Sequence, residues 1–291
     1  MDNQKPEKKL KIAIIGTGLI GCSMADGLRV MAEETSGVDN NAGHLQEALS
    51  RGLIDRSMPL EKAVKSAGLV IVTVPVDKSI DLIPKILDHI GPHSVVIDAG
   101  SVKTAVCRSI EDHPKRSQFV AAHPMAGLAA SGPDAADANI FHNRKVIICE
   151  HEKSSGQAME TASMVFKKLG MNIIFMSPET HDIIVARVSH LPQIIAYCLA
   201  AGTTGKAHER VSPGSIASTG YESSTRLASS PANMWIPIFQ HNSENLAESL
   251  DDIIALLSDM RNMIKNGQWK PVKELIEKAN KIREDFLSEY K

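Results

Sequence analysis

A glycine-rich turn near the N-terminus is the first pattern in this sequence that points to a chemical role. Residues 16–21 read GTGLIG, follow the apolar strand candidate KIAII and open a helix, which is the context in which such a turn binds a dinucleotide. The first glycine permits a tight turn, the second lets a pyrophosphate approach the backbone, and the third lets the helix pack close to the sheet. The helix N-terminus then faces the phosphates. The predicted contacts are Gly16, Gly18, Leu19, Ile20 and Gly21.

An acidic residue stands where the ribose of such a cofactor is expected. Asp39 ends a second strand candidate near residues 36–38 and lies 18 residues after Gly21, close to the roughly 20 residues typical of this fold. A carboxylate there accepts a hydrogen bond from the adenosine 2′-hydroxyl and repels a 2′-phosphate, and residues 40–42 include no arginine to bind that phosphate. The sequence therefore predicts NAD rather than NADP, with an ordinary turn residue as the alternative role of Asp39.

A third strand candidate ends at the edge where ligands of open α/β sheets bind. The segment VTVPVD at residues 72–77 carries the chain past the carboxyl end of that strand. We expect Pro75 and Val76 to line the nicotinamide side of the cofactor, with packing of the loop as the alternative.

Three further segments resemble a known family when taken in combination and order. They are DAGSVK at residues 98–103, HPMAG at 123–127 followed by Ser131-Gly132, and HD at 181–182 followed by SHLP at 189–192. With the glycine turn, they make the chain resemble the prephenate/arogenate dehydrogenase family from about residue 11 to 240. The resemblance implies oxidative decarboxylation of prephenate to 4-hydroxyphenylpyruvate, with hydride transfer to NAD, in tyrosine biosynthesis.

The resemblance assigns the catalytic roles to His123 and Ser101. His123 follows the strand candidate QFVAA, and histidine has an unperturbed pKa of about 6.5, which suits a general base. A structural histidine before proline is the alternative. Ser101 resembles the hydroxyl that orients this histidine and the substrate, and it is also expected at the cofactor; it could equally cap a helix starting at Val102. For Lys103 the sequence leaves a cofactor-facing and a solvent-facing position open.

The resemblance also implies cations that hold the two carboxylates of the substrate. Arg226 ends the segment YESSTR and matches the family arginine that binds the ring carboxylate, which a guanidinium can grip with two hydrogen bonds; an ordinary surface arginine is the alternative. We expect Asp182 and His190 to support the pocket, where they could pair with arginines. A solvent-facing Asp182 and a buried, hydrogen-bonded His190 are the equal alternative. Arg187, about one turn before His190, is expected on roughly the same helix face, where it would attract the side-chain carboxylate, with an arginine that reaches to solvent as the equal alternative. The predicted substrate-binding residues are Arg226, His190, Asp182, Arg187 and Gln193.

The chain departs from the family pattern at three places that bear on the substrate. Many members have an acidic residue after HPxAG, where this chain has Leu128-Ala129-Ala130; many have a second histidine at Gln193; and many read FRD at residues 221–223. Arogenate carries an ammonium in place of the keto group of prephenate, and a pocket selective for it gains from a nearby carboxylate. Because Ala129 is not acidic, we expect prephenate, with arogenate as the alternative that Glu222 would favour.

The elements that position these residues alternate between strands and helices in the first part of the chain. Runs rich in Val and Ile, apolar throughout, predict a doubly wound parallel sheet of the Rossmann type covered on both faces. After about residue 177 the strand candidates stop, and helices are predicted over 178–201, 246–264 and 269–290, with a Gly/Ser-rich segment at 202–231. We therefore expect a dinucleotide-binding domain at 1–177 and an all-α substrate and dimerisation domain at 178–291. The apolar stripe of the 246–264 helix favours a homodimer seam or an internal core about equally.

Composition narrows the classes of partner. The net charge of −2 and the aromatic content of 4% give no reason to expect a nucleic acid or an anionic membrane. The four cysteines are scattered without metal-ligand spacing, so we expect reduced thiols, no metal and a cytoplasmic protein. No segment reaches the ~18 apolar residues of a membrane span. Two alternative functions stay open: another two-domain NAD-dependent hydroxyacid or imine dehydrogenase, whose usual helical-domain lysine is missing from 178–200, and a catalytically inactive NAD-binding sensor.

Overall fold

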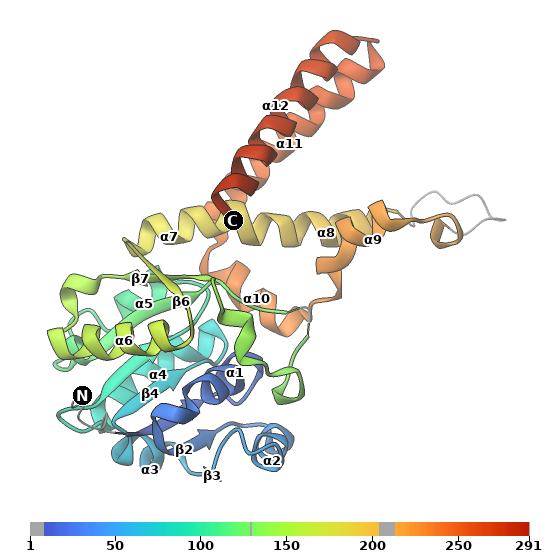
Figure 1. Ribbon diagram of the computed structural model, residues 1–291. Helices are drawn as coiled ribbons and strands as arrows, with labels where there is room; N and C mark the ends of the chain where they lie inside the picture. Colours follow the sequence, from blue (N-terminus) through green and yellow to red (C-terminus); the bar gives the residue numbers. More distant parts are fainter. Residues whose placement is uncertain (1–8, 129, 204–212, 291) are drawn as a thin grey trace, which may run out of the picture. The chain divides into compact units, whose positions relative to one another are not determined.

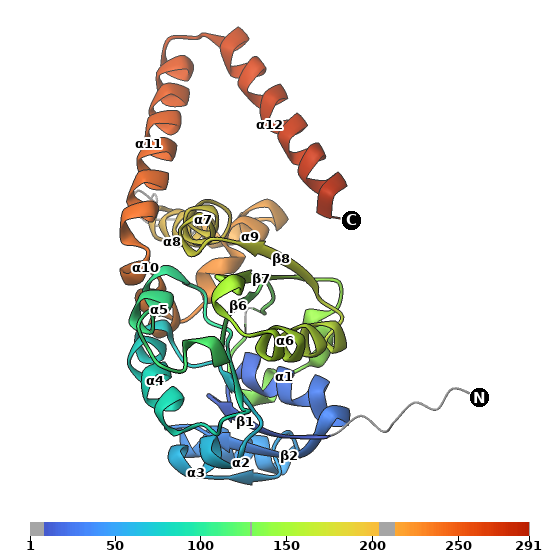
Figure 2. The same cartoon turned by 90° about the vertical axis from the view of Figure 1, so that its left-hand side faces the viewer.

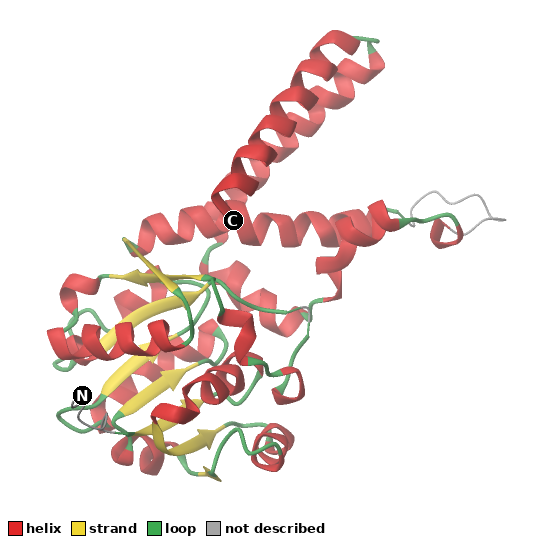
Figure 3. Ribbon diagram, viewed as in Figure 1, coloured by secondary structure: helices red, strands yellow, loops and turns green. Residues whose placement is uncertain are grey.

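The computed structural model describes residues 9–128, 130–203 and 213–290, and its first part is built on one eight-stranded sheet (Figures 1 and 3). The strand order is β3-β2-β1-β4-β5-β6-β7-β8. This is the doubly wound order expected for a dinucleotide-binding fold, in which the chain moves outward from β1 to β3 and then crosses back to β4 on the other side of β1. The strands are β1 Leu10–Ile15, β2 Ala32–Val38, β3 Arg56–Ser57, β4 Leu69–Val72, β5 Val95–Asp98, β6 Phe119–Pro124, β7 Lys145–Cys149 and β8 Asn172–Met176.

The sheet is mixed rather than wholly parallel, which corrects part of the sequence prediction. The strands from β3 to β6 are parallel, whereas β7 pairs antiparallel to β6 and β8 runs parallel to β7. The connection from β6 to β7 contains two short 3₁₀ turns, Pro133–Ala135 and Ala138–Phe141, in place of a crossover helix. A parallel pair requires a crossover of a dozen or more residues, usually helical, so a return without one reverses the strand.

Helices cover both faces of the sheet because side chains of each strand alternate between two cores. On β1, Ile12 and Ile14 pack in a cluster with residues of α1 and α6, while Ala13 and Ile15 pack with residues of α3, α4 and α5. Both clusters are closed to solvent, as the continuous Val- and Ile-rich strands predicted. The helices are α1 Leu19–Leu28, α2 Ala42–Ser50, α3 Leu60–Ser66, α4 Val76–His89, α5 Thr104–Ser109 and α6 Gly156–Lys168.

In the described residues after β8, helices are the regular elements. α7 begins at Pro178, where the Ser177 hydroxyl accepts a hydrogen bond from the Thr180 N–H, in the manner of an N-cap. A π-helical turn at Ala186–His190 joins it to α8. The later helices are α8 Leu191–Gly202, α9 Thr219–Thr225, α10 Ala232–His241, α11 Ser243–Lys265 and α12 Trp269–Tyr290.

The chain divides into two compact units, Met1–Ser243 and Glu244–Lys291. The second unit consists of α11 and α12, joined by a turn at Gly267 with a φ of 65° (Figure 2). Along the predicted apolar stripe of α11, Leu246 is buried but Leu257 and Ile264 are 59% and 49% exposed. The outer part of the stripe is therefore exposed, whereas its first residue is buried.

One stretch is longer and more apolar than the sequence analysis expected. Residues Pro178–Gly202, spanning α7 and α8, are long and apolar enough by composition to cross a membrane, with a mean hydropathy of 1.5. Such a stretch is weak evidence of a membrane span, since a helix that packs against other protein passes the same test. In this chain the stretch carries His181, Asp182 and His190, all buried in polar contacts.

Candidate active site

The glycine turn after β1 has the geometry that its sequence pattern predicted. Gly16 has a φ of 99°, and a Cβ added there would lie 2.9 Å from the Thr73 backbone. At Gly21, a Cβ would come within 2.1 Å of the Gly16 carbonyl oxygen, so only glycine lets α1 lie this close to the turn. A Cβ on Gly18 would meet nothing within 4 Å. Gly18 thus borders open space at the N-terminus of α1, where Leu19 and Ile20 form the first turn and a pyrophosphate can approach.

Asp39 holds the glycine turn from the end of β2. Its Oδ2 accepts hydrogen bonds from the Thr17 N–H at 2.7 Å and the Thr17 hydroxyl at 3.1 Å, and its Oδ1 accepts from the Asn41 N–H at 2.8 Å. A carboxylate offers about four acceptor positions, so these bonds leave capacity for a ribose hydroxyl. Asp39 therefore has a structural task in the turn that spacing alone did not indicate.

Pro75 and Val76 differ in their surroundings. Pro75 is exposed immediately before α4, whereas the Val76 side chain is buried with Val102 and Ile238. Val76 therefore packs within the protein, which was the alternative role considered for this loop. A contact with nicotinamide stays a prediction for both residues.

His123 lies at one end of a buried line of hydrogen bonds. It is 8% exposed, in β6, near the carboxyl edge of the parallel strands. Its Nδ1 lies 2.8 Å from Nε2 of His181, and Nδ1 of His181 lies 2.7 Å from Oδ1 of Asp182. Three side chains from two distant segments, β6 and α7, thus form one line of polar contacts.

The line of contacts determines which nitrogen of His123 carries a proton. An ionised carboxylate only accepts hydrogen bonds, so Asp182 requires a proton on Nδ1 of His181. Neutral His181 then accepts at Nε2, which requires His123 to donate from Nδ1. The remaining nitrogen, Nε2 of His123, keeps its lone pair and is able to take a proton. This tautomer is the one that a general base needs.

Burial keeps both imidazoles neutral. It lowers the pKa of His123 well below the usual 6.5, and the nearby His181 and Lys103 act in the same direction. The pKa of His181 is also lowered, chiefly by burial, although its hydrogen bond to Asp182 acts in the opposite direction. At neutral pH, His123 is therefore in the form that accepts a proton.

Asp182 connects this line to the start of α5. Its Oδ1 and Oδ2 accept hydrogen bonds from the backbone N–H groups of Lys103 and Thr104, each at 2.9 Å. Burial would raise the pKa of Asp182, but the hydrogen bonds from His181 and from these two amides bring it below its usual value. Asp182 was expected to pair with an arginine or to face solvent. Among the described residues it does neither, because α7 lies against the N-terminus of α5.

Ser101 occupies the loop between β5 and α5 and is half-buried. The helix begins at Thr104, with Asp182 satisfying its first amides, so the idea that Ser101 caps a helix starting at Val102 is wrong. Among the described residues Ser101 makes no hydrogen bond to His123, and its orienting role remains a prediction.

His190 is buried behind the same site. Its Nδ1 lies 3.2 Å from Nδ2 of Asn242, which also donates to the Asp182 carbonyl oxygen at 2.8 Å. The ring of Trp235 meets that of His190 edge to face, with centroids 6.0 Å apart. Burial lowers the pKa of His190 to about 4, so the side chain is a neutral hydrogen-bonding group at neutral pH.

The other three predicted substrate-binding residues differ in their exposure and contacts. Gln193 is 1% exposed and donates to the Leu227 carbonyl oxygen at 2.6 Å, so it fixes the segment that follows α9. Arg226, at the end of α9, is exposed. Arg187 is exposed as well, whereas His190 is buried, so the shared helix face expected for them is wrong. The π-turn that contains both is wider than 3.6 residues per turn and rotates one away from the other.

Sequence reasoning missed several groups that the fold brings to His123. His181 was part of a motif but received no role, Lys103 was left open, and Asp98 and Asn242 were not considered for the site. The HD pair beside a conventional helix start was the only signal available for His181. Asn242 gave none, since its contacts depend on how α10 returns to α7. The position after HPMAG, Ala129, lies outside the described residues.

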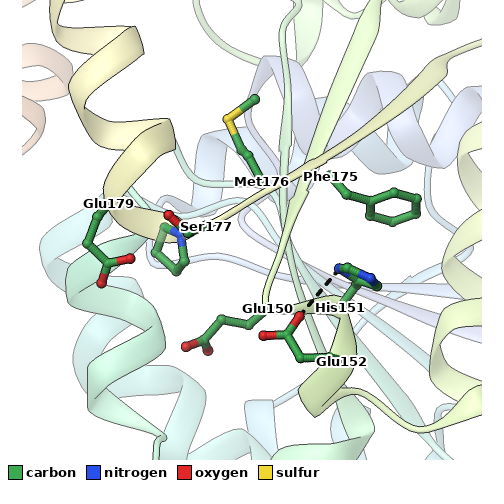
Figure 4. Close-up of a pocket in the computed structure, with 8 residues that line it drawn as sticks. Glu150, His151, Glu152, Phe175, Met176, Ser177 and Glu179 are labelled. Atoms are coloured by element: carbon green, nitrogen blue, oxygen red, sulfur yellow. Dashed lines mark ion pairs between the residues drawn. The ribbon is translucent and has the colours of Figure 1, made fainter.

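A pocket of about 450 Å³ lies elsewhere in the structure, at the ends of β7 and β8 (Figure 4). Glu150 and Glu152 extend toward the same space, and Glu152 pairs with His151 at 3.4 Å. Because β7 runs antiparallel to β6, it ends at the opposite edge of the sheet from His123. The pocket contains none of the predicted site residues. Its lining residues are Glu150, His151, Glu152, Phe175, Met176, Ser177, Pro178 and Glu179.

Comparisons with known proteins agree with both parts of this architecture. The family model "Prephenate dehydrogenase, nucleotide-binding domain" matches residues 24–175, and "Prephenate dehydrogenase, dimerization domain" matches residues 177–278. Prephenate dehydrogenase of Bacillus subtilis is 32% identical over 265 residues, which cover 89% of this chain and 71% of the relative.

Solved structures are similar over nearly the whole chain. A crystal structure of prephenate dehydrogenase from A. aeolicus, in complex with hydroxyphenyl propionate and NAD+, has a TM-score of 0.89 and 26% identity, covering 97% of this chain and 100% of that one. Arogenate dehydrogenase from Synechocystis has a TM-score of 0.77 and 27% identity, covering 95% of this chain and 99% of that one. With its nucleotide-binding fold, its buried histidine site and the match of the family models along its length, this chain belongs to the prephenate dehydrogenase family.

Proposed function

We propose that this protein catalyses the NAD-dependent oxidative decarboxylation of prephenate to 4-hydroxyphenylpyruvate. The observation that carries the proposal is the buried line of polar contacts from His123 through His181 to Asp182, from which we infer that Nε2 of His123 is left as a proton acceptor. The B. subtilis and A. aeolicus proteins, both named prephenate dehydrogenases, support the choice of reaction.

The residues around the glycine turn fit NAD. The turn has a glycine cradle that added Cβ atoms would fill and open space beside Gly18. Asp39 has acceptor capacity for the adenosine ribose and would repel the phosphate of NADP. When bound, NAD supplies the hydride acceptor. The solved A. aeolicus structure contains NAD+.

His123 would take the proton of the ring hydroxyl at Nε2. Loss of that proton accompanies departure of hydride from the same ring carbon. The carboxylate at the opposite ring carbon leaves as carbon dioxide, and the electrons of the broken carbon–carbon bond make the ring aromatic. The phenolate oxygen would then take the proton back from His123, which gives the hydroxyl of 4-hydroxyphenylpyruvate. Proton abstraction by a positioned base typically contributes ~10²–10⁴-fold to a rate. Burial of His123 keeps it neutral and ready for this step.

The substrate carboxylates require cations, which we assign to Arg226 for the ring carboxylate and to Arg187 for the side chain. Both residues are exposed in the single chain. The YESSTR segment supports the assignment of Arg226. The assignment of Arg187 is no longer supported by a helix face shared with His190. Gln193 and His190 offer neutral hydrogen-bonding groups nearby in sequence. Prephenate is proposed because Ala129 supplies no carboxylate for an ammonium.

Arogenate is the second candidate substrate. It is favoured by the exposed carboxylate of Glu222, four residues before Arg226, and by the similarity to the Synechocystis arogenate dehydrogenase. The test is NADH formation, followed by absorbance at fixed enzyme, with prephenate and then with arogenate. A higher kcat/KM for arogenate would assign the second substrate, and no turnover of either would overturn the proposed function.

The helical part is proposed to form a homodimer in the cytoplasm. α8 and α11 each carry exposed apolar side chains that a second copy would bury, Leu199 on α8 and Leu257 and Ile264 on α11. The match to the dimerization domain of the family supports this assembly. A boundary at residues 177/178, directly after β8, remains our proposed division between the nucleotide-binding and helical domains.

A further inference from the structure

A buried ion pair beside His123 has no part in the reaction proposed above. Lys103 and Asp98 are both 0% exposed, and the ammonium of Lys103 contacts Oδ2 of Asp98. Removing two charges from water is costly, and well-packed apolar residues of similar volume often stabilise a fold equally well or better. Stability alone therefore gives a weak reason for this pair, and its contacts indicate a second role.

Lys103 makes hydrogen bonds at both ends of the line that runs from His123 to Asp182. Its Nζ donates to the carbonyl oxygen of Ala122 at 2.7 Å, and Ala122 directly precedes His123 in β6. Its backbone N–H donates to Oδ1 of Asp182 at 2.9 Å, the same oxygen that accepts from His181. One residue thus fixes the peptide before His123 and the carboxylate at the far end of the hydrogen-bonded line.

Asp98 extends this arrangement to the serine loop. It is the last residue of β5, and its Oδ1 accepts a hydrogen bond from the Gly100 N–H at 3.0 Å. Gly100 directly precedes Ser101. The pair therefore links four segments that must be held together at the site. They are the carboxyl ends of β5 and β6, the loop carrying Ser101 and the start of α7.

We propose that Lys103, paired with Asp98, is a positioning residue that holds His123 in place and in its proton-accepting form. The proposal rests on the function proposed above, in which His123 is the base. The Lys103 side chain is shielded from solvent, and its charge also lowers the pKa of the nearby imidazole. Burial is the largest cause of the lowered pKa of His123. Three charged or titratable groups lower it further: His181 from α7, Lys103 from the loop before α5 and His190 from the π-turn.

The test removes both charges together, so that no buried charge is left unpaired. The double variant Lys103→Met with Asp98→Asn is compared with wild type and with the control Lys62→Met, an exposed lysine on α3. Protein labelled with ¹⁵N-histidine is titrated by NMR, with His123→Asn used to assign the signal. We expect His123 in the double variant to protonate at higher pH and to lose part of its Nδ1–H tautomer, while the control follows wild type.

Kinetics supply the second measurement. In the double variant we expect kcat to fall at least tenfold and the acid limb of the pH–rate profile to move to higher pH, with the KM for NAD within threefold of wild type. A further variant, Lys103→Gln with Asp98→Asn, keeps a donor for the Ala122 carbonyl without the positive charge. We expect it to recover part of kcat but to keep the shifted titration, and it replaces the first variant should that fail to fold.

The outcomes separate this proposal from the one on which it rests. If the neutral variants keep the wild-type histidine titration and tautomer, the pair is structural only and the positioning role is refuted. If wild type turns over neither prephenate nor arogenate, the proposed function fails, and the NMR titration still decides whether Lys103 controls His123.

Discussion

Replacing His181 tests the tautomer argument most directly. In the variant His181→Leu, the Nδ1–H of His123 loses its acceptor inside a site where His123 is only 8% exposed. An unsatisfied buried donor is unfavourable by about 1–3 kcal/mol. His123 can avoid this penalty by moving its proton to Nε2, which removes the lone pair that the reaction needs.

The size of the effect follows from that penalty. If 1–3 kcal/mol is the free energy that favours the productive tautomer, its loss lowers kcat by about 5- to 150-fold. Binding of NAD should be nearly unchanged, because the glycine turn and Asp39 are remote from His181 in the contacts described above. The assay is steady-state NADH formation with prephenate, together with NAD binding measured by fluorescence.

Two further variants distinguish a chemical role for His181 from a merely structural one. In His181→Gln, the amide can accept from His123 through its oxygen and donate to Asp182 through its nitrogen, so we expect a substantial part of kcat to return. His93→Leu changes an exposed histidine in a loop and should behave as wild type. A His181→Leu enzyme with kcat within threefold of wild type would refute the reasoning, as would equal loss in the leucine and glutamine variants.

Four other outcomes are expected. His123→Asn should lower kcat by ~10²–10⁴-fold with little change in NAD binding. If this variant retained a tenth of the wild-type kcat, the base would lie elsewhere. Because burial lowers the pKa of His123, the wild-type rate should fall only at pH values below 6.5. Asp39→Ser should narrow the preference for NAD over NADP and also weaken NAD binding, since Thr17 loses its acceptor; equal kcat/KM for the two cofactors in wild type would contradict the assignment. Arg226→Ala should raise the KM for prephenate at least tenfold and spare the Kd for NAD, whereas a KM within threefold would make it an ordinary surface residue. Light scattering at micromolar concentration should give about twice the chain mass of 31.5 kDa, and a value near 31.5 kDa would rule out the dimer.

The cofactor half of the protein was largely predictable because its signals are local. Gly16 and Gly21 act within a few residues of the strand and helix they join. The continuously apolar sequences of β1 and β4 are typical of strands buried on both faces. The wrong direction of β7 arose because an apolar run looks the same in a parallel and in an antiparallel pair. The absence of a crossover helix between Pro124 and Lys145 was the available warning.

The catalytic centre depended on contacts between residues far apart in sequence. His123 and His181 are separated by 58 positions, and Lys103 and Asp182 by 79. Their hydrogen bonds exist because α7 packs against the start of α5, which no local pattern specifies.

The sequence by itself determined the residue types of the site, the nucleotide-binding turn and the succession of strands and helices, since each depends on near neighbours in the chain. Tertiary structure decided the rest. The π-turn rotated Arg187 away from His190, and the packing of α7 converted Asp182 from an expected arginine partner into a cap for α5 and an anchor for His181. Hydrogen-bond partners and protonation states are properties of side chains brought together by folding, and for that reason only the folded chain shows which nitrogen of His123 is free to act.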